Sequence, residues 1–298
     1  MRVVECVPNF SEGRRPEVIE QIVAQAKAVD GVTVLDVNPD HDHNRVVVTM
    51  IGDPQAVSEA AFRCCAEASR LIDMNVHSGE HPRMGATDVI PFVPLSGVTM
   101  EDCVQLAEGL AQRIAEELEI PVYLYERAAR TPERRNLADV RRGEYEGLKE
   151  LIGTEERKPD FGPARMHPTA GATAVGARPP LVAFNVNLAS DDLKLARRIA
   201  RKIRESGGGF PAVKALGVMI GERNLAQVTM NMVDYTVTGL LPVYRAIEAE
   251  AAKAGVEIAG SEIIGLLPLQ AMLDVALQAL KVEEFGNEQL LELHLKGE

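Results

Sequence analysis

The stretch "VTVLDVNPDHDHNRVVVTMI", residues 32–51, decides the fold. Its first part, 32–37, and its last part, 45–51, are rich in β-branched residues, which favour strands. The polar residues 38–44 between them are typical of a turn. Two such runs joined by a short turn predict an antiparallel pair of strands.

Amphipathic helices and further strands flank this pair. Pro16 opens the preceding helix, because proline suits the first helical position. Asp53 and Pro54 open the following helix, and both helices carry an apolar stripe at helical spacing. Short apolar runs at 2–8 and 88–95 predict one strand before the first helix and another after the second. The order is therefore β-α-β-β-α-β.

The second half of the chain repeats this order. Residues 181–187, 213–220 and 226–235 predict strands, and the last of these alternates apolar with polar residues. A helix follows the first of the three strands, and its apolar stripe consists of Leu193, Ala196, Ile199, Ala200 and Ile203. Residues 237–255 are largely helical by pattern, and 256–268 contain a strand.

The repeated order is that of the ferredoxin-like unit, which packs helices on one face of an antiparallel sheet. We therefore predict an α+β protein with two ferredoxin-like (βαββαβ) subdomains, residues 1–180 and 181–298, and a cleft between them. Residues 157–180 are rich in Gly, Pro and Ala. Unstructured connections beyond about 12–15 residues are usually functional or disordered, so a functional loop is expected there.

Composition excludes several classes of protein. The chain has 298 residues and a formal net charge of -12, which repels nucleic-acid backbones, so no nucleic-acid partner is expected. Its four cysteines form no CxxC pair, which predicts small buried side chains in a reducing compartment. No apolar run approaches the ~18 residues of a membrane span. We expect a cytoplasmic protein with no membrane partner.

The stretch "HSGEHPRMGATD", residues 77–88, allows three interpretations. His77 and His81 would share a helix face as a metal pair, but Gly79 and Pro82 oppose helical geometry. The loop can also be an ordinary solvated one. In the third interpretation the glycines and the proline fix a backbone that presents His81 to a cleft as a proton-transfer group. There Glu80 and Arg83 flank the ring and tune its charge.

Two further stretches carry candidate binding residues. In "NPDHDHNR" (38–45) the histidines and aspartates are of metal-ligand types, although a charged turn is the commoner explanation. Arg45 can hold a carboxylate with two hydrogen bonds. In "GPARMHPTAGATAVGAR" (162–178) the glycines allow close approach to a flat ligand, and a domain connector explains the pattern equally well.

Taken together, ordered stretches across residues 1–280 resemble the formiminotransferase family. The matching stretches are "VECVPNFSEG" (4–13), "LIDMNVHSGEHPRMGATDVIPFVPL" (71–95), "PVYLYERAARTPERRNLADVRRGEYEGL" (121–148), "PDFGP" (159–163), "GATAVGAR" (171–178), "AFNVNL" (183–188) and "NLAQVTMN" (224–231). The resemblance implies transfer of a formimino group from N-formimino-L-glutamate to N5 of tetrahydrofolate, which gives L-glutamate and 5-formiminotetrahydrofolate.

The resemblance also implies site residues and partners. The catalytic histidine of the family falls on His81. The folate-binding stretch falls on Gly162, Pro163, Ala164, Arg165, Met166, His167, Pro168, Thr169, Ala170 and Gly171. Tetrahydrofolate is then a co-substrate, formiminoglutamate and folate are the small-molecule partners, and a homodimer is suggested.

The chemistry of the transfer adds further expectations. The folate amine must lose a proton and the departing glutamate amine must gain one, and a histidine near its ordinary pKa serves both steps. Both substrates carry carboxylates, so Arg45, Arg83 and Arg178 are candidate binding residues. No metal is expected. Formyl transfer involving tetrahydrofolate and a non-catalytic ligand sensor are the alternatives.

Overall fold

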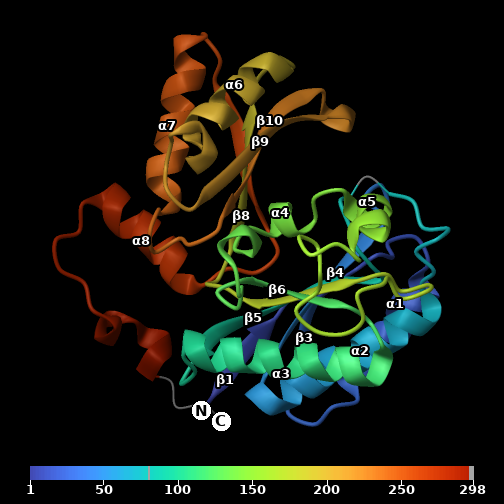
Figure 1. Ribbon diagram of the computed structural model, residues 1–298. Helices are drawn as coiled ribbons and strands as arrows, with labels where there is room; N and C mark the ends of the chain where they lie inside the picture. Colours follow the sequence, from blue (N-terminus) through green and yellow to red (C-terminus); the bar gives the residue numbers. More distant parts are fainter. Residues whose placement is uncertain (80, 295–298) are drawn as a thin grey trace. The chain divides into compact units, whose positions relative to one another are not determined.

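The computed structural model describes residues 1–79 and 81–294, so Glu80 and its predicted influence on His81 lie outside the described residues. The chain divides into two compact units, which we call unit 1 (Met1–Pro179) and unit 2 (Pro180–Glu298). Both units combine helices with a sheet (Figure 1), as the α+β prediction requires. The predicted cleft between the subdomains stays a prediction.

Unit 1 contains one sheet and two sets of helices. Its strands are β1 (Val3–Cys6), β2 (Asn9–Phe10), β3 (Val32–Asp40), β4 (Arg45–Gly52), β5 (Thr87–Ser96), β6 (Val122–Glu126) and β7 (Thr173–Ala177). Its helices are α1 (Pro16–Lys27), α2 (Pro54–Leu71), α3 (Met100–Leu118), α4 (Leu137–Val140) and α5 (Glu144–Leu151).

The strand pairs of unit 1 confirm the predicted hairpin and extend the predicted sheet. β3 pairs antiparallel with β4, β4 pairs with β1 and β2, and both of these pair with β5. This is the strand order of a ferredoxin-like sheet. β7 then pairs in parallel with β5, and β6 pairs in parallel with β7. The sheet therefore continues past the predicted unit by two parallel strands.

β7 corrects the expectation that residues 157–180 form one functional loop. All five residues of β7 are buried, and the strand lies between β5 and β6. A Cβ on Gly176 would lie 2.6 Å from the ring of Tyr125, so only glycine fits there. A strand buried on both faces lacks the alternation that reveals a half-exposed strand, and this explains why the pattern suggested a loop.

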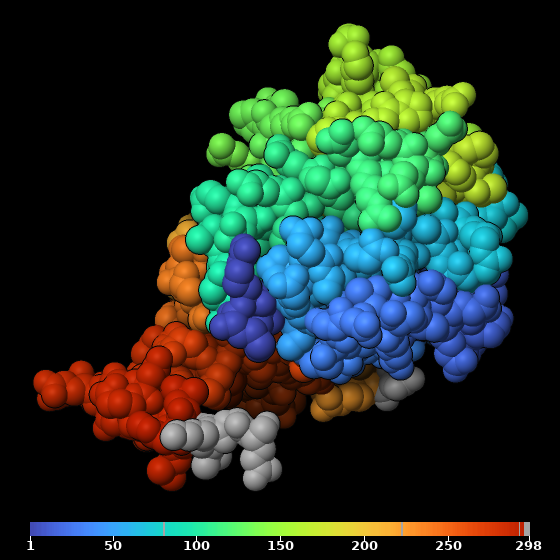
Figure 2. All heavy atoms as spheres, turned by 90° about the horizontal axis from the view of Figure 1, so that it is seen from below, coloured from blue at the N-terminus to red at the C-terminus, as the bar shows by residue number. Residues whose placement is uncertain are grey.

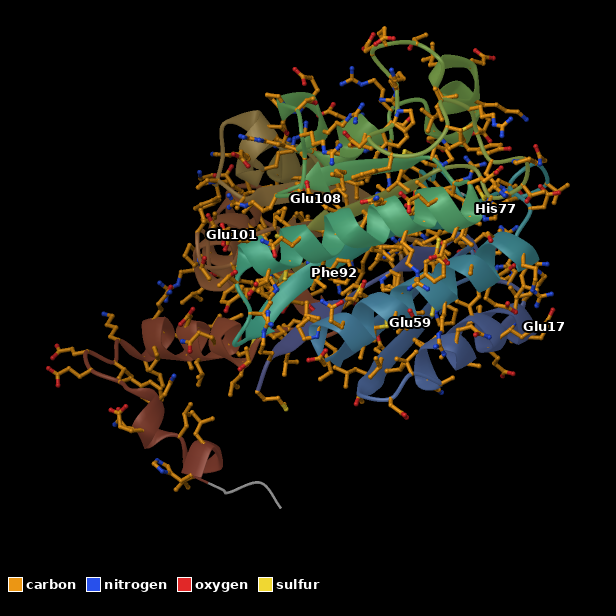
Figure 3. All side chains as sticks on the ribbon, turned by 60° about the horizontal axis from the view of Figure 1, so that its bottom comes forward. Glu17, Glu59, His77, Phe92, Glu101 and Glu108 are labelled. Atoms are coloured by element: carbon orange, nitrogen blue, oxygen red, sulfur yellow. The ribbon has the colours of Figure 1, made fainter. Side chains whose placement is uncertain are left out.

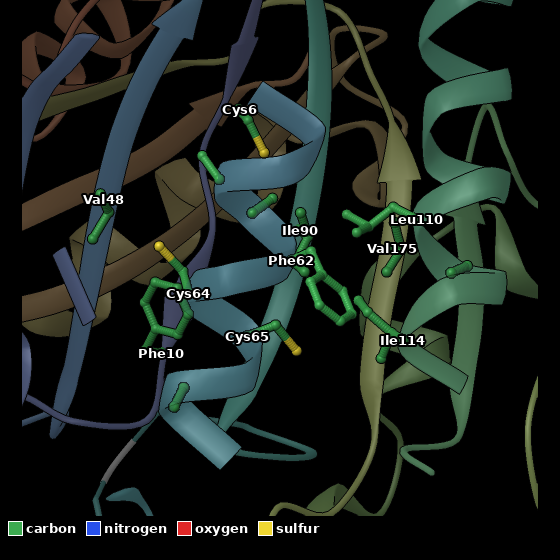
Figure 4. Packing of buried hydrophobic residues seen from close by; sticks show 14 of the residues in the cluster. Cys6, Phe10, Val48, Phe62, Cys64, Cys65, Ile90, Leu110, Ile114 and Val175 are labelled. Carbon is green, nitrogen blue, oxygen red and sulfur yellow. The ribbon is translucent and has the colours of Figure 1, made fainter. Parts of the chain in front are cut away.

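The core of unit 1 lies between the sheet and helices α1, α2 and α3. Figure 4 shows Phe62, Cys64 and Cys65 of α2, with Leu110 and Ile114 of α3, packed against the strands. All four cysteines are buried and unpaired, as predicted. A second cluster, which includes Met84, Tyr123 and Leu148, lies against the opposite face beneath α4 and α5. Strand β5 is consequently buried on both faces.

Unit 2 has the predicted order of elements. The strands are β8 (Val182–Leu188), β9 (Val213–Ile220), β10 (Leu225–Met232) and β11 (Ile258–Ile264), and the helices are α6 (Leu193–Ile203), α7 (Leu240–Lys253) and α8 (Leu269–Leu280). The sheet order β11-β8-β10-β9, antiparallel throughout, is again that of a ferredoxin-like sheet. Helix α8 follows the repeat and was not predicted.

Single-turn 3-10 helices complete both units, at Pro132–Arg134, Glu205–Gly207, Gly221–Arg223, Asn287–Gln289 and Leu291–His294. Among the described helices, none combines the length and the apolar character that crossing a bilayer demands.

Candidate functional site

The loop of residues 72–86 connects α2 to β5 and carries both candidate histidines. Hydrogen bonds fasten its C-terminal end, where Met84 N donates to Asp88 Oδ1 (2.9 Å) and Ala86 N donates to the Ala170 carbonyl (2.8 Å). Figure 3 shows His77 at the end of the helical layer opposite Glu101, which lies at the beginning of α3. The loop therefore closes one end of the sheet.

Two glycines let the loop approach other backbone segments. A Cβ on Gly79 would lie 2.3 Å from the carbonyl oxygen of His43, and a Cβ on Gly85 would lie 2.2 Å from that of Ala172. Real Cβ atoms do not approach carbonyl oxygens so closely. The glycines thus fit the loop between the β3–β4 turn and residues 170–172, while the presentation of His81 to a cleft stays a prediction.

His81 lies beside Arg45, the first residue of β4. The Arg45 Nη1 and His81 Nε2 atoms are 2.9 Å apart. A guanidinium can only donate, so Nε2 accepts and the ring carries its proton on Nδ1. Asn9 Oδ1 lies 3.4 Å from the same Nη1. Another guanidinium nitrogen, Arg45 Nε, is buried and has no hydrogen-bond partner among the described residues.

The surroundings of His81 correct the expectation of an ordinary pKa. Burial, the Arg45 guanidinium and then Arg141 lower the pKa of His81 to about 2. The protonated ring is disfavoured because it would place a second cation beside Arg45. The ring is therefore a neutral acceptor at neutral pH, and it can act first as a base. It becomes an acid only after it has taken a proton.

Arg45 itself has an unusual electrostatic position. Within the described part of the chain it forms no ion pair with a carboxylate, and burial with the charge of Arg141 lowers its pKa. Arg141, by contrast, pairs with the buried Asp88. Arg45 is thus a half-buried cation with unused hydrogen-bond capacity, which suits the binding of an anionic group. Sequence reasoning singled out Arg45 but not its contacts with His81 and Asn9.

His77 has a structural environment that differs from that of His81. Its Nε2 donates to the Asn44 carbonyl at 3.0 Å, and its Nδ1 accepts from Arg83 Nε at 3.3 Å. Both ring nitrogens are therefore used within the protein, so His77 connects the loop to the β3–β4 turn. Burial is the main cause that lowers the pKa of His77.

Arg83 is occupied by carboxylates of α5. Its side chain is 8% exposed and forms ion pairs with Glu144 (3.1 Å) and Glu146 (2.7 Å). Because these carboxylates and His77 use its donors, Arg83 has little capacity left for a substrate carboxylate. This placement opposes the substrate-binding role expected for Arg83 and makes it a residue that fastens α5 to the loop.

Arg178 is not brought near His81. Its backbone N–H donates to the Phe92 carbonyl, five residues along β5 from Thr87, where the loop ends. At about 3.3 Å per residue this separates the two positions on β5 by roughly 17 Å. Burial raises the pKa of Glu5, and the charge of Arg178 opposes that rise. Arg45 is therefore the expected substrate arginine whose side chain is seen to contact His81.

The 162–171 stretch has one exposed half and one anchored half. Gly162, Ala164 and Arg165 are exposed. At the other end Met74 N donates to the Thr169 carbonyl (2.8 Å), and Ala170 is buried with 1% exposure. The anchored half therefore packs against both ends of the loop that carries His81.

The turn of His167 stabilises this arrangement. Its Nδ1 accepts from the backbone N–H groups of Thr169 (3.3 Å) and Ala170 (3.0 Å). Asn75 Nδ2 donates to the Pro168 carbonyl at 2.8 Å, which ties the same turn to the loop after α2. These hydrogen bonds fasten the 167–170 turn to the rest of unit 1.

The 38–45 stretch forms a charged turn, the explanation favoured from its sequence. Asp40 Oδ1 accepts from the backbone N–H groups of Asp42 (3.1 Å) and His43 (3.0 Å), and Asp40 Oδ2 pairs with His43 Nδ1 (2.7 Å). Over residues 1–79 and 81–294 we find no group of three or more His, Cys, Asp or Glu side chains placed to hold a metal ion.

Two sizeable hollows lie away from His81. One of about 520 Å³ lies between α2 and α3, lined in part by Arg2, Glu59 and Arg113; Figure 2 shows the first residues, in dark blue, seated between these helices. The other, of about 550 Å³, belongs to unit 2 and is lined in part by Tyr235 and Asp274. Neither hollow is lined by a residue of the 72–86 loop. The candidate site is therefore identified from the chemistry of its side chains and not from a cavity.

Comparisons with known proteins show the family to which the chain belongs. Residues 3–178 match the family model "Formiminotransferase domain, N-terminal subdomain", and residues 183–292 match the family model "Formiminotransferase domain". The chain is 52% identical over 297 residues to the glutamate formimidoyltransferase of Streptococcus pyogenes, with 99% of each chain covered. It is 46% identical to the glutamate formimidoyltransferase of Thermoplasma acidophilum, covering 98% of this chain and 97% of the relative.

A third relative is longer. The formimidoyltransferase-cyclodeaminase of Mus musculus is 47% identical over 281 residues, which cover 92% of this chain and 52% of the relative. The chain thus spans about half of that two-part protein.

Proposed function

Because the chain belongs to the formiminotransferase family, we propose that it transfers a formimino group from N-formimino-L-glutamate to N5 of tetrahydrofolate. The products are L-glutamate and 5-formiminotetrahydrofolate, a step of histidine degradation and one-carbon metabolism. The observation that carries the proposal is 52% identity over nearly the whole chain to a glutamate formimidoyltransferase. Tetrahydrofolate is then a co-substrate, and no metal takes part.

His81 is the proposed proton-transfer residue. N5 of tetrahydrofolate attacks the formimino carbon, forms a new C–N bond and loses its proton to Nε2 of His81. The bond from that carbon to the glutamate nitrogen then breaks, and the nitrogen receives the proton from His81. A neutral ring suits the first step, and the ring is neutral beside Arg45.

Arg45 is the proposed partner of a substrate carboxylate. Its Nη1 donates a hydrogen bond to Nε2 of His81, the atom that must accept the proton. A carboxylate that binds Arg45 competes for this donor and adds a negative charge near the ring. The competition frees Nε2. The added negative charge raises the pKa of His81 toward the range that proton transfer needs. Substrate binding thereby prepares the base.

The proposed folate-binding stretch is Gly162–Gly171. Support comes from its fixed turn at His167 and from its hydrogen bonds to both ends of the loop that carries His81. Its exposed half offers backbone amides to a flat ligand.

A coupled assay distinguishes the proposal from the alternatives. Purified protein is mixed with tetrahydrofolate and either formiminoglutamate or N-formylglutamate, and the folate product is followed by absorbance. Formimino transfer predicts turnover with the first donor. Turnover only with the second would identify a formyl transferase, and binding of both without turnover would identify a sensor.

A further inference from the structure

Arg141 is a second arginine near His81, and it was not among the expected substrate residues. It directly follows α4, whose last residue, Val140, belongs to the hydrophobic cluster on the sheet face beneath α4 and α5. Successive residues of a strand point to opposite faces, and Val46 of β4 packs in the core beneath α1, α2 and α3. Arg45, the residue before it, therefore points to the same side of the unit 1 sheet as Arg141.

Asp88 connects Arg141 to the loop that carries His81. Its Oδ2 accepts a hydrogen bond from Arg141 Nη2, while its Oδ1 accepts from the backbone N–H of Met84 at 2.9 Å. Met84 follows His81 by three residues in the sequence. Because the side chain of Asp88 is 1% exposed, its two hydrogen bonds fix the Arg141 guanidinium beside the loop.

Electrostatic effects agree with this placement of the two guanidiniums. Burial has the largest effect on the pKa of His81, and the charges of Arg45 and then Arg141 lower it further. After burial, the charge of Arg141 is also the main cause that lowers the pKa of Arg45. Coulomb interactions weaken with distance, so the three groups lie near one another. Arg45, which contacts the ring, is the nearer of the two cations.

Arg141 keeps hydrogen-bond capacity for a ligand. Of its guanidinium nitrogens, only Nη2 is bonded to a described residue, so Nη1 still has its N–H groups. The side chain is 15% exposed, which leaves part of it open to a ligand. Arg83 differs, because Glu144, Glu146 and His77 use its donors. We call Arg45 and Arg141 the arginine pair; among the described carboxylates, Asp88 alone forms an ion pair with it.

We propose that the arginine pair recognises the two carboxylates of the formimino donor, an inference that rests on the proposed function. Arg45 binds the α-carboxylate and Arg141 binds the γ-carboxylate. The α-carboxylate is attached to the carbon that bears the reacting nitrogen, so it must lie beside the proton-transfer ring, where Arg45 is. Two methylene groups separate the γ-carboxylate from that carbon, so it reaches the more distant cation. Guanidiniums suit this task because their planar fork matches a carboxylate.

The carboxylates of tetrahydrofolate fit the arginine pair less well. They belong to a glutamate attached beyond a benzoyl ring, whereas N5, which must lie at His81, belongs to the pterin. The arginine pair is therefore too close to the reacting atoms for that glutamate. A purely structural role for Arg141, in which it fastens the end of α4 to Asp88, involves no ligand and would affect all donors equally.

Two donors test the proposal: N-formimino-L-glutamate and N-formimino-L-glutamine, whose side-chain amide is neutral. The wild type should use the glutamate donor with a kcat/KM about 10- to 100-fold higher, the fold-change that corresponds to one charged hydrogen bond. Arg141→Met combined with Asp88→Asn should reduce this preference to about threefold or less, with the KM for tetrahydrofolate near wild type. The second change avoids an unpaired buried carboxylate and keeps an oxygen for the N–H of Met84.

Arg142→Met is the matched control, because Arg142 is an exposed neighbour of Arg141 that pairs with Asp139. It should retain the wild-type preference and both KM values. If the double variant unfolds early in thermal melting, Arg141→Gln replaces it, since glutamine keeps an N–H donor for Asp88 but removes the positive charge. The preference for the glutamate donor should fall in this variant as well.

Three results would overturn the proposal: equal use of both donors by the wild type, a preference that persists in the Arg141 variants, or a rise only in the KM for tetrahydrofolate. Calorimetry with each donor in the absence of tetrahydrofolate needs no turnover. Tighter binding of the glutamate donor without any transfer would refute the proposed function and still support the arginine pair. Equal binding of the two donors would refute the arginine pair whatever the turnover.

Discussion

Arg45 Nη1 lies 2.9 Å from Nε2 of His81, so a cationic side chain donates a hydrogen bond to the nitrogen that is proposed to accept the substrate proton. The neighbouring cation keeps the ring neutral, and burial strengthens the effect. This contact gives the site a measurable signature in stability, in pH dependence and in kinetics.

The first prediction concerns acid stability. The pKa of His81 is about 2 in the folded protein, against an ordinary value of 6.5, so between these values the unfolded chain binds more protons than the folded one. Stability from this group is fully present above pH 6.5 and falls as the pH falls toward 2. At pH 5 the loss is about 2 kcal/mol. Urea unfolding of wild type and His81→Gln at pH 7 and pH 5 should show a smaller loss in the variant; equal losses would contradict the shift.

The second prediction concerns turnover. His81→Ala should lower kcat by roughly 10²–10⁴-fold, the range for one acid–base group, with much smaller changes in both KM values. His77→Ala should be milder in kcat, because His77 serves the Asn44 carbonyl and Arg83 rather than the reaction. His41→Ala, at an exposed histidine, is the control and should leave kcat unchanged. Near-normal turnover of His81→Ala, measured by the product absorbance, would remove His81 from the mechanism.

The third prediction separates the two arginines. Arg45→Met should raise the KM for a carboxylate substrate about 10- to 100-fold with stability unchanged or higher, because the buried Arg45 Nε has no partner among the described residues. Arg83→Met should instead lower the free energy of unfolding by about 1–2 kcal/mol, since it breaks the pairs with Glu144 and Glu146. Its KM values should stay close to wild type. The opposite assignment of the two effects would exchange the roles of the residues.

The fourth prediction tests the fit of the loop. Gly85→Ala should cost about 3 kcal/mol or more and reduce turnover, since its Cβ would meet the carbonyls of Ala172 and Ala170 at 2.2 and 2.5 Å. Gly109→Ala is the matched control, because it lies in α3 with open space around its Cβ. There alanine should stabilise by about 1 kcal/mol. Thermal melting measures both, and a tolerated Gly85→Ala would show that the loop yields.

The fifth prediction concerns metals. Both ring nitrogens of His77 are used by protein groups, and Nε2 of His81 faces a guanidinium, so neither histidine is placed to donate a lone pair to an ion. Prolonged chelator treatment followed by desalting should leave turnover unchanged. Activity that disappears on chelation and returns with a divalent ion would establish a metal requirement.

Local pattern was sufficient for most of the fold. Helical periodicity located α1, α2 and α6, and alternation and β-branched runs located the strands of both ferredoxin-like units. Pattern failed for β7, since a short strand of Thr, Ala, Val and Gly buried on both faces has no alternation. It also failed for α8, whose apolar residues are spread around the helix and leave only Ala271 buried.

The site was harder to predict than the fold. The glycines correctly indicated a closely fitted loop around His81, because glycine acts on its own backbone. The partner of His81 depends on which residue of β4 comes level with the loop, and that is a tertiary matter. The sequence does not distinguish Arg45 from Arg83. In the structure Arg83 pairs with Glu146, whereas no described carboxylate pairs with Arg45.

The position of β7 has a consequence for the synthesis of the chain. β5 and β6 are complete by Glu126, yet the strand that fills the gap between them ends only at Ala177. Until then a growing polypeptide exposes two unpaired strand edges, which readily pair with other chains. At about 5–20 residues per second the ribosome needs several seconds to cover that interval. Unit 1 therefore passes through an aggregation-prone stage in every round of translation. This stage ends when β7, the last strand of unit 1, inserts between β5 and β6.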